Sequence, residues 1–252
     1  MSFTVPTIEW AGLAPVLIIL GAGVLGVLVE ALVPRAGRLY TQAVLSALAV
    51  LGAGAAFVMR WAQVLPQDAS TGQVVPSGSV LTPGISEDPF GVAAQGIMLV
   101  IGLLAVLVMA DRTTADDGAF AAQAADRPGS AEEAESLHAG WTGTEVFPLT
   151  LFSLGGMMLF PLSSNLIALF VMLELVSLPL YIMAAMARHR RLLSQEAALK
   201  YFVLGAFASA FLLMGAALLY GFSGSVSYTD IAAAIRYGAV PGMDRLVLAG
   251  AA

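Results

Sequence analysis

Charged residues are scarce in this 252-residue sequence, and their scarcity excludes an ordinary soluble domain. Asp, Glu, Lys and Arg together make up 11% of the residues, whereas a soluble domain carries about 25%. Hydrophobic residues make up 59%, and the mean hydropathy is +0.87. The composition therefore predicts a polytopic membrane protein.

Cysteine is absent, and histidine occurs only as His138 and His189. The lack of thiols excludes disulfides, thiolate metal sites, cysteine-ligated iron–sulfur clusters and a cysteine nucleophile. Neither histidine has neighbours at the spacing of metal ligands. The net charge of −6 collects largely in Asp111–Glu145 and gives no indication of a nucleic-acid partner. We therefore expect no cofactor, metal or nucleic acid on this chain, and any redox centre has to lie on a partner chain.

Six apolar stretches approach or exceed the roughly 20 residues that a membrane-spanning helix needs. They run over Leu13–Val33, Leu39–Val64, Val92–Ala110, Val146–Leu162, Leu166–Ala187 and Ala197–Phe222. A seventh begins near Leu246, shortly before the sequence ends at Ala252. We expect one all-α membrane domain over residues 1–252, a polytopic transmembrane helix bundle with six complete spans plus the start of a seventh.

Arginines in two short loops predict the orientation of the bundle. Arg35 and Arg38 join the first two stretches, and "RHRR" at 188–191 joins the last two. Since the cytoplasmic side of a membrane protein carries the excess of Lys and Arg, both loops are expected to be cytoplasmic and the N-terminus outside. Arg60, near the outer end of the second stretch, is expected to extend its guanidinium to the outer surface.

Three other connections differ from these loops in composition. Residues 67–88 lack Lys and Arg and are rich in Pro, Gly and Ser, which indicates an irregular external connection. Residues 112–143 form an acidic insertion, which alternation places in the cytoplasm and whose composition predicts mobility. The segment "SYTDIAAAIRYG" predicts a short amphipathic external helix with Ser227 or Thr229 near its start.

Glu174 is the first of two charged candidates inside the apolar stretches. It lies about 12 Å from the outer end of the fifth stretch, near mid-membrane, where a charged side chain costs about 2.5–3.5 kcal/mol. Ser177 and Tyr181 share its helix face at i+3 and i+7, and Pro179 predicts a bend. Because acids at such depth are usually functional, Glu174 is a candidate site residue, with Ser177 and Tyr181 as secondary candidates. The alternative is a neutral, hydrogen-bonded acid that only holds helices together.

Lys200 is the second candidate and the only lysine of the chain. A buried lysine can lose its proton, whereas arginine stays protonated, so Lys200 suits a proton-exchanging site. We expect it within about two turns of Glu174 in depth on a neighbouring antiparallel helix. An assumed separation of about 10 Å and a dielectric of about 20 give an attraction of about 1.7 kcal/mol. The alternative is that Lys200 extends to the cytoplasmic interface or pairs with Glu196 at i−4.

Glu30 is a further candidate near the cytoplasmic end of the first stretch. Arg35 and Arg38 follow it closely, so an interfacial ion pair is the favoured interpretation and a place in a proton path is the alternative. Glu196, the possible partner of Lys200, completes the secondary candidates.

The segment from Asn165 to Ile235 carries a family resemblance. "LELVSLPLY", "EAALKYFVLGAFASAFLL" and "LLYGFSGS" resemble the antiporter-like membrane subunits of bacterial NADH:quinone oxidoreductase, respiratory complex I, and the N type in particular. The resemblance implies a proton-translocating subunit with Glu174 and Lys200 in a half-channel of buried acids and lysines. The family pattern continues with a lysine in a broken seventh helix, so this sequence is expected to be the N-terminal part of a longer subunit.

The same resemblance implies the localisation of the chain and its partner subunits. It indicates a non-redox subunit of the enzyme, multi-pass in the bacterial inner membrane, with flavin and iron–sulfur clusters on partner subunits. Neighbouring antiporter-like subunits, small membrane subunits, peripheral subunits and lipid are the expected partners. Two alternatives stay open, a subunit of a multisubunit cation/proton antiporter and a purely structural membrane subunit.

The absence of cysteine allows the orientation to be tested with single cysteine substitutions. Ala36→Cys and His189→Cys are expected to react with a membrane-impermeant maleimide only from the cytoplasmic side, and Gly78→Cys only from outside, because alternating spans put these loops on opposite faces. Labelling of right-side-out and inside-out vesicles measures the difference. The opposite labelling pattern would overturn the predicted orientation.

Overall fold

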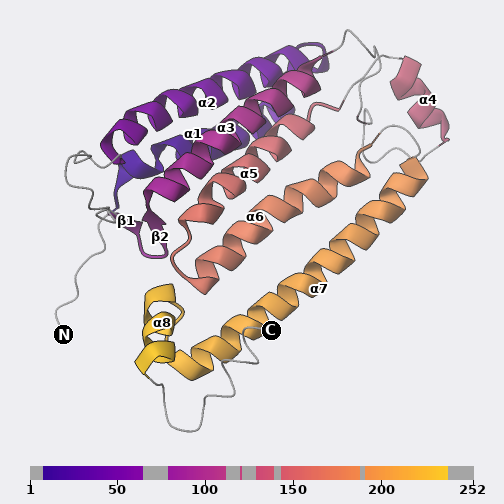
Figure 1. Ribbon diagram of the computed structural model, residues 1–252. Helices are drawn as coiled ribbons and strands as arrows, with labels where there is room; N and C mark the ends of the chain where they lie inside the picture. The colour runs from indigo at the N-terminus through magenta and orange to yellow at the C-terminus, as the bar shows by residue number, and fades with distance from the viewer. Residues whose placement is uncertain are drawn as a thin grey trace.

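The computed structural model describes residues 8–64, 79–111, 120, 129–138, 143–187 and 191–237. Its elements are α1 (Trp10–Leu32), α2 (Arg35–Val64), β1 (Ser79–Thr82), β2 (Ile85–Glu87), α3 (Pro89–Ala110), α4 (Ala131–His138), α5 (Val146–Leu159), η1 (Phe160–Leu162), α6 (Leu166–Ala185), α7 (Arg191–Ser223) and α8 (Tyr228–Tyr237). The long helices lie side by side, with the β-hairpin at one end and α4 near the other (Figure 1). We call these the hairpin end and the loop end.

Five helices are long and apolar enough to cross a membrane, namely α1, α2, α3, α6 and most of α7. The predicted fourth span is a shorter apolar helix over Val146–Leu162, formed by α5 and η1. The described residues are thus predominantly helical with five candidate membrane spans, which confirms the helical membrane-protein part of the predicted fold class, whereas six complete spans stay a prediction. The seventh span predicted near Leu246 lies outside the described residues, and the orientation of the N-terminus stays a prediction.

Helix α5 lies at the centre of the bundle and contacts α1, α3 and α6. Its largest buried side chains are at most 2% exposed: Phe147, Leu151, Leu154 and Met158. Because lipid is as apolar as these side chains, packing contacts rather than the hydrophobic effect hold membrane helices together. Two adjacent glycines permit the closest contacts. A Cβ at Gly155 would overlap a leucine of α1, and one at Gly156 would lie 2.9 Å from the backbone nitrogen of Val176 on α6.

Side-chain caps begin α3 and α6 at the hairpin end. Asp88 Oδ1 accepts a hydrogen bond from the N–H of Gly91 at 2.6 Å. Asn165 Oδ1 accepts one from the N–H of Ala168, also at 2.6 Å. Each carboxylate or amide oxygen satisfies an N–H that the start of a helix leaves unpaired, so the two helices begin at defined residues.

The connection between α2 and α3 ends in a two-stranded antiparallel hairpin, in which Ser79 pairs with Glu87. Pro83 and Gly84 form its turn, and Gly84 has a φ of +91°. Only glycine adopts this left-handed region without a steric penalty, and Pro-Gly is a turn signal. The prediction of an irregular connection was therefore wrong for these residues.

The hairpin closes one end of the bundle. Leu81 is fully buried and packs against Leu13 of α1. Its carbonyl accepts a hydrogen bond from the N–H of Glu9 at 2.9 Å, and the carbonyl of Gly84 accepts one from Ser164 at 2.9 Å. The hairpin thereby ties the start of α1 to the segment that precedes α6.

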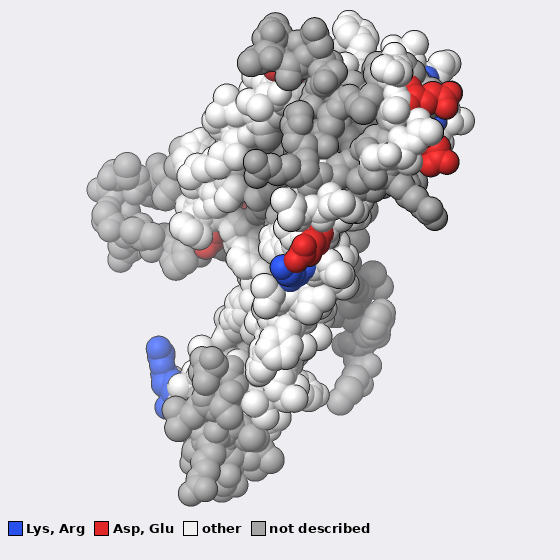
Figure 2. All heavy atoms as spheres, turned by 90° about the vertical axis from the view of Figure 1, so that its right-hand side faces the viewer, with Lys and Arg blue, Asp and Glu red and all other residues white. Residues whose placement is uncertain are grey.

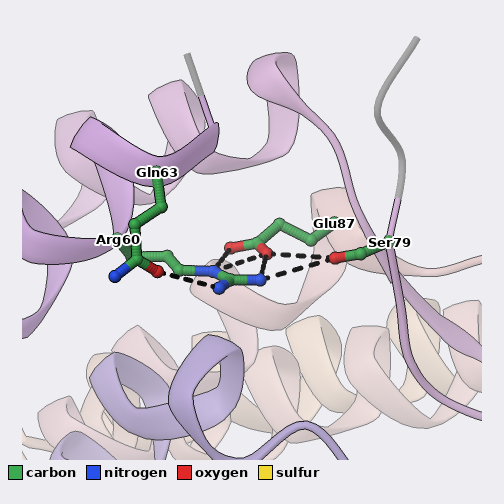
Figure 3. Close-up of polar contacts among 4 residues, drawn as sticks. All are labelled: Arg60, Gln63, Ser79 and Glu87. Atoms are coloured by element: carbon green, nitrogen blue, oxygen red, sulfur yellow. Dashed lines mark hydrogen bonds and ion pairs between the residues drawn. The ribbon is translucent and has the colours of Figure 1, made fainter. Parts of the chain in front are cut away.

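Arg60 on α2 binds the hairpin instead of extending to the surface, which corrects the sequence prediction. Its Nε donates to both carboxylate oxygens of Glu87, at 3.0 and 2.8 Å, and its Nη2 lies 2.5 Å from Oε2. Figure 3 shows the guanidinium aimed at Glu87, with Ser79 and Gln63 completing the cluster. The Glu87 side chain is 2% exposed, and a carboxylate this deeply buried needs a cationic partner.

Two further predictions concern the polar segments. The acidic insertion, 112–143, contains α4, and most of its other residues lie outside the described part of the chain, so its mobility stays a prediction. The short helix predicted after the sixth span is confirmed as α8, which starts directly after Ser227 and buries Ile231. A β-bridge from Ser227 to Asn165 places its start beside the start of α6.

The Arg60–Glu87 pair is expected to contribute strongly to stability. Glu87→Ala should lower the free energy of unfolding by about 3–5 kcal/mol, because it leaves the guanidinium without its buried partner. The double variant Arg60→Leu, Glu87→Leu should recover most of this loss, since no uncompensated charge then remains. Thermal unfolding of the detergent-solubilised protein measures both. Gln63→Ala, which removes only a neutral hydrogen bond to Arg60, is the comparison and should cause a smaller loss. Equal losses in the single and double variants would show that the ion pair is not the cause.

Candidate functional site

Helices α6 and α7 lie side by side (Figure 1) and hold most of the candidate residues. On α7 a stripe of small residues runs through Ala198, Gly205, Ser209 and Ala216. Steps of seven, four and seven residues keep them on one helix face, and three of them are buried on a helix that is otherwise largely exposed. Small residues let backbones approach closely, which leaves room for the polar side chains of α6.

Glu174 projects from the middle of α6 and is partly buried. Its Oε1 accepts a hydrogen bond from the hydroxyl of Ser209 on α7. Within the described ranges, no Lys or Arg forms an ion pair with Glu174. A serine hydroxyl can donate to a carboxylate and can also accept from a protonated acid. The contact therefore suits both protonation states of Glu174.

The two secondary candidates on α6 do not bond to Glu174. Ser177 donates from Oγ to the carbonyl of Leu173 at 2.8 Å, within its own helix. Tyr181 packs edge-on against the ring of Tyr201, with centroids 4.6 Å apart. Its hydroxyl lies where a Cβ at Gly205 would be. Tyr181 thus packs against α7 through its ring contact with Tyr201. Its hydroxyl fits beside α7 because Gly205 has no side chain.

Pro179 of α6 and Ser153 of α5 both affect the backbone hydrogen bonding of α6 near Glu174. Pro179 lies inside α6 and has no N–H, so the carbonyl of Leu175 lacks its usual helical partner. Ser153 of α5, which is 1% exposed, donates to the next carbonyl, that of Val176, at 3.1 Å. Helix α5 therefore supports α6 at the turn that follows Glu174.

Lys200 pairs with Glu196 at i−4, as the alternative interpretation of the sequence predicted. Its Nζ lies 2.5 Å from Glu196 Oε1, and the two side chains are 69% and 58% exposed. Large apolar side chains around it on α7, such as Leu199, Val203 and Leu204, are also more than half exposed. Figure 2 shows that few of the described residues on the displayed face are charged and that these lie among uncharged ones.

The structure does not bring Lys200 and Glu174 together. Ser209, the partner of Glu174, follows Lys200 by nine residues, which corresponds to about 13 Å along α7. Nine residues also rotate the helix by about two and a half turns, so Lys200 faces away from Ser209. Glu174 thus contacts α7 about two and a half turns from Lys200, whereas the sequence predicted a depth difference of about two turns at most.

Glu30 lies in a polar cluster at the loop end, where the predicted ion pair with Arg38 is confirmed. Arg38 Nη1 lies 3.5 Å from Glu30 Oε2, and Arg38 Nε donates to the carbonyl of Val33 at 2.7 Å. Gln42 Nε2 donates to Glu30 Oε1 at 2.8 Å. The Glu30 and Arg38 side chains are 16% and 26% exposed, so the cluster is partly buried.

Glu145, directly before α5, adds a second acid to the loop end. Partial burial of its carboxyl, and then the charge of Glu30, raise its pKa above the ordinary value. Arg38 acts in the opposite direction. The three charges therefore form one interacting group, in which Arg38 offsets the repulsion between two carboxyls.

Sequence reasoning predicted Glu196 as a partner of Lys200 and Arg38 as a partner of Glu30, but it missed the other polar partners. Ser209 and Gly205 were noticeable only as small residues suited to helix packing, and Glu87, Gln42 and Glu145 carried no local signal. No group of three or more His, Cys, Asp or Glu with metal-binding geometry occurs in the part of the chain that the structure describes.

Relatives of the chain are closely similar over almost all of its length. NADH-quinone oxidoreductase subunit N of Beutenbergia cavernae is 49% identical and matches 99% of this chain and 46% of its own length. Subunit N of Acidothermus cellulolyticus is 48% identical and matches 98% of this chain and 45% of its own length. The chain is a relative of NADH-quinone oxidoreductase subunit N. The predicted family resemblance is thereby confirmed, and the chain spans about half the length of these subunit N relatives.

The family described as "NADH:quinone oxidoreductase/Mrp antiporter, TM" matches residues 163–249. This range includes Glu174, Lys200 and Ser209 but not the cluster around Glu30.

Two solved structures share the fold of this chain. "Respiratory complex I from Thermus thermophilus with bound Aureothin" matches with a TM-score of 0.59 and 24% identity, over 94% of this chain and 42% of that chain. The archaeal membrane-bound sulfane sulfur reductase matches with a TM-score of 0.64 and 20% identity, over 96% and 42%. At these identities the likeness concerns the fold alone. The helix arrangement is therefore one that respiratory membrane complexes contain.

Proposed function

We propose that this chain is the N-terminal part of a proton-translocating, antiporter-like membrane subunit of a bacterial NADH:quinone oxidoreductase. The observation that carries the proposal is Glu174, a partly buried acid in the middle of an apolar helix, hydrogen-bonded to Ser209 of the next helix. Such an acid is costly in a membrane and is usually functional. Its bond to a hydroxyl rather than to a cation leaves it free to bind and release a proton.

Lys200 is the second proton-exchanging group in this proposal, and Glu196 is its partner in the present geometry. The pair lies near the loop end of α7, on the side turned away from Glu174. A proton route that uses both residues has to cross α7, so Glu174 and Lys200 serve as separate stations rather than as one ion pair. Ser177 and Tyr181 support the helix contact beside Glu174.

The proposal also covers the membrane, the complex and the partner subunits in which the chain resides. The chain is a non-redox subunit of a bacterial inner-membrane complex, and flavin and iron–sulfur clusters reside on partner subunits. Its partners are other antiporter-like, small membrane and peripheral subunits, together with lipid. Copurification with flavin- and iron–sulfur-bearing proteins tests this assembly. Copurification with cation/proton antiporter subunits instead would favour the alternative that the chain belongs to such an antiporter, which the matched family description also names.

Glu174 is expected to be required for pumping. In the full-length subunit within its assembled complex, Glu174→Gln should reduce the protons pumped per NADH oxidised, or turnover, by about tenfold or more, because a neutral amide cannot exchange the proton. Glu174→Asp should cause a smaller loss. Pumping into sealed vesicles measures the effect, native gels check assembly, and Glu132→Gln on the exposed α4 is the matched control. Normal pumping by an assembled Glu174→Ala variant would reduce the carboxyl to a structural role.

Substitutions of Lys200 and Glu196 distinguish a lysine that releases a proton from one that only forms a structural ion pair. If Lys200 releases a proton during turnover, Lys200→Arg should abolish most pumping, because arginine does not lose its proton in proteins. Glu196→Gln, which breaks the same ion pair, should then cause little loss. Both are measured in sealed vesicles with assembly checked. Full activity of Lys200→Arg would remove Lys200 from the proton route, since arginine can form the ion pair with Glu196 but keeps its proton.

A further inference from the structure

The backbone of α6 lies directly against α5 at the turn that follows Glu174. A Cβ at Gly156 of α5 would lie 2.9 Å from the backbone nitrogen of Val176 and 3.1 Å from the carbonyl carbon of Leu175. A side chain at this position would therefore push against the backbone of α6. Glycine allows the two helices to approach this closely.

Ser153, about one turn earlier on α5, adds a hydrogen bond at the same turn of α6. Its side chain is buried, and its hydroxyl donates to the carbonyl oxygen of Val176 at 3.1 Å. Pro179, three residues further along α6, has no N–H, and a proline ring disturbs the helical turn before it. Inside a membrane, a hydroxyl from a neighbouring helix can satisfy backbone groups at such a turn. Ser153 thus holds a turn of α6 that Pro179 weakens.

Glu174 lies on the opposite side of this turn from α5. Helix α6 lies between α5 and α7 (Figure 1), and residues two positions apart on a helix are rotated by about 200°. The Val176 side chain accordingly lies beside Gly156 of α5. The Glu174 carboxyl accepts its hydrogen bond from Ser209 of α7. A shift of the turn relative to α5 therefore changes the distance between the carboxyl and the Ser209 hydroxyl.

We infer that Ser153 is a positioning residue for Glu174. Its hydrogen bond to the carbonyl of Val176 fixes the turn against α5, at the place where the Glu174 carboxyl meets the Ser209 hydroxyl. Ser153 does not contact the carboxyl and acts through the backbone of α6. The effect on pumping rests on the proposed function of Glu174, whereas the effect on the position of the carboxyl does not.

Removal of the Ser153 hydroxyl should separate Glu174 from Ser209. In Ser153→Ala, the distance from Ser209 Oγ to the nearer carboxyl oxygen of Glu174 should exceed about 3.5 Å, outside hydrogen-bonding range, because the turn loses its bond to α5. Electron cryomicroscopy of the full-length subunit in its assembled complex measures this distance in the variant and in the wild type. Ser153→Cys, which keeps most of the volume but has only a weak donor, should act in the same way and covers the case in which the alanine variant does not assemble.

Ser46→Ala is the matched control for this measurement. Ser46 is a fully buried serine of α2 whose hydroxyl bonds to no described residue, so its removal should leave the distance between Glu174 and Ser209 unchanged. A serine that only satisfies a backbone carbonyl would lower stability without moving Glu174. An unchanged distance in the Ser153 variants therefore overturns the inference.

Two adjacent glycines of α5 provide a second test of the same contact. Gly156→Ala places a methyl against the backbone of α6, which has to shift, and should displace Glu174 relative to α5. Gly155→Ala is the control, because its Cβ meets the side chain of Leu20 on α1, which can move, and Glu174 should stay in place. Equal displacements of Glu174 in the two variants would contradict its positioning by this contact.

Pumping shows whether the position matters for the proposed function. Ser153→Ala should lower the protons pumped per NADH oxidised, or turnover, by about fivefold, the factor that corresponds to one lost hydrogen bond. Ser153→Thr, which keeps a hydroxyl, should retain most of the activity. If Ser153→Ala pumps normally while Glu174→Gln does not, the positioning role is wrong and the proposed function stands. If Ser153→Ala moves the carboxyl while Glu174→Gln pumps normally, the proposed function is wrong and the positioning stands.

Discussion

The close approach of apolar helices around α5 is the constraint on which the rest of the structure depends. Lipid competes equally for apolar side chains, so these helices gain stability only where their surfaces fit tightly. Gly155 and Gly156 supply that fit toward α1 and α6, and the small-residue stripe of α7 supplies it toward α6. Larger residues at these points would move the helices apart, and the polar contacts between them would be lost.

Three polar contacts of this bundle join two different elements. Arg60 of α2 meets Glu87 of the hairpin, Glu174 of α6 meets Ser209 of α7, and Glu30 of α1 meets residues of α2. Each contact reduces the cost of burying a polar group. The three differ in chemistry. The two ion pairs fix charges in place, whereas the acid bonded to a hydroxyl can change its protonation state without losing its partner.

Contacts between residues close in sequence were predictable, and distant ones were not. Lys200 and Glu196 are four residues apart on one helix, and Glu30 and Arg38 are joined by a short turn at Pro34, so proximity in sequence implied proximity in space. Glu174 and Ser209 are 35 residues apart, and Arg60 and Glu87 are 27 apart. Their pairing depends on helix rotation and on the hairpin, which no local pattern encodes.

The sequence by itself determined the apolar helices, most of their boundaries, the family resemblance and the place of Glu174 inside an apolar stretch. These properties follow from hydropathy, length and local motifs, which act within one helix. Tertiary structure alone decided which face of α7 meets Glu174, that Lys200 faces the other way, and that Arg60 is held by the hairpin. A difference of one residue in helix rotation moves a side chain by about 100°, so the polar partners are set by how the helices pack against each other.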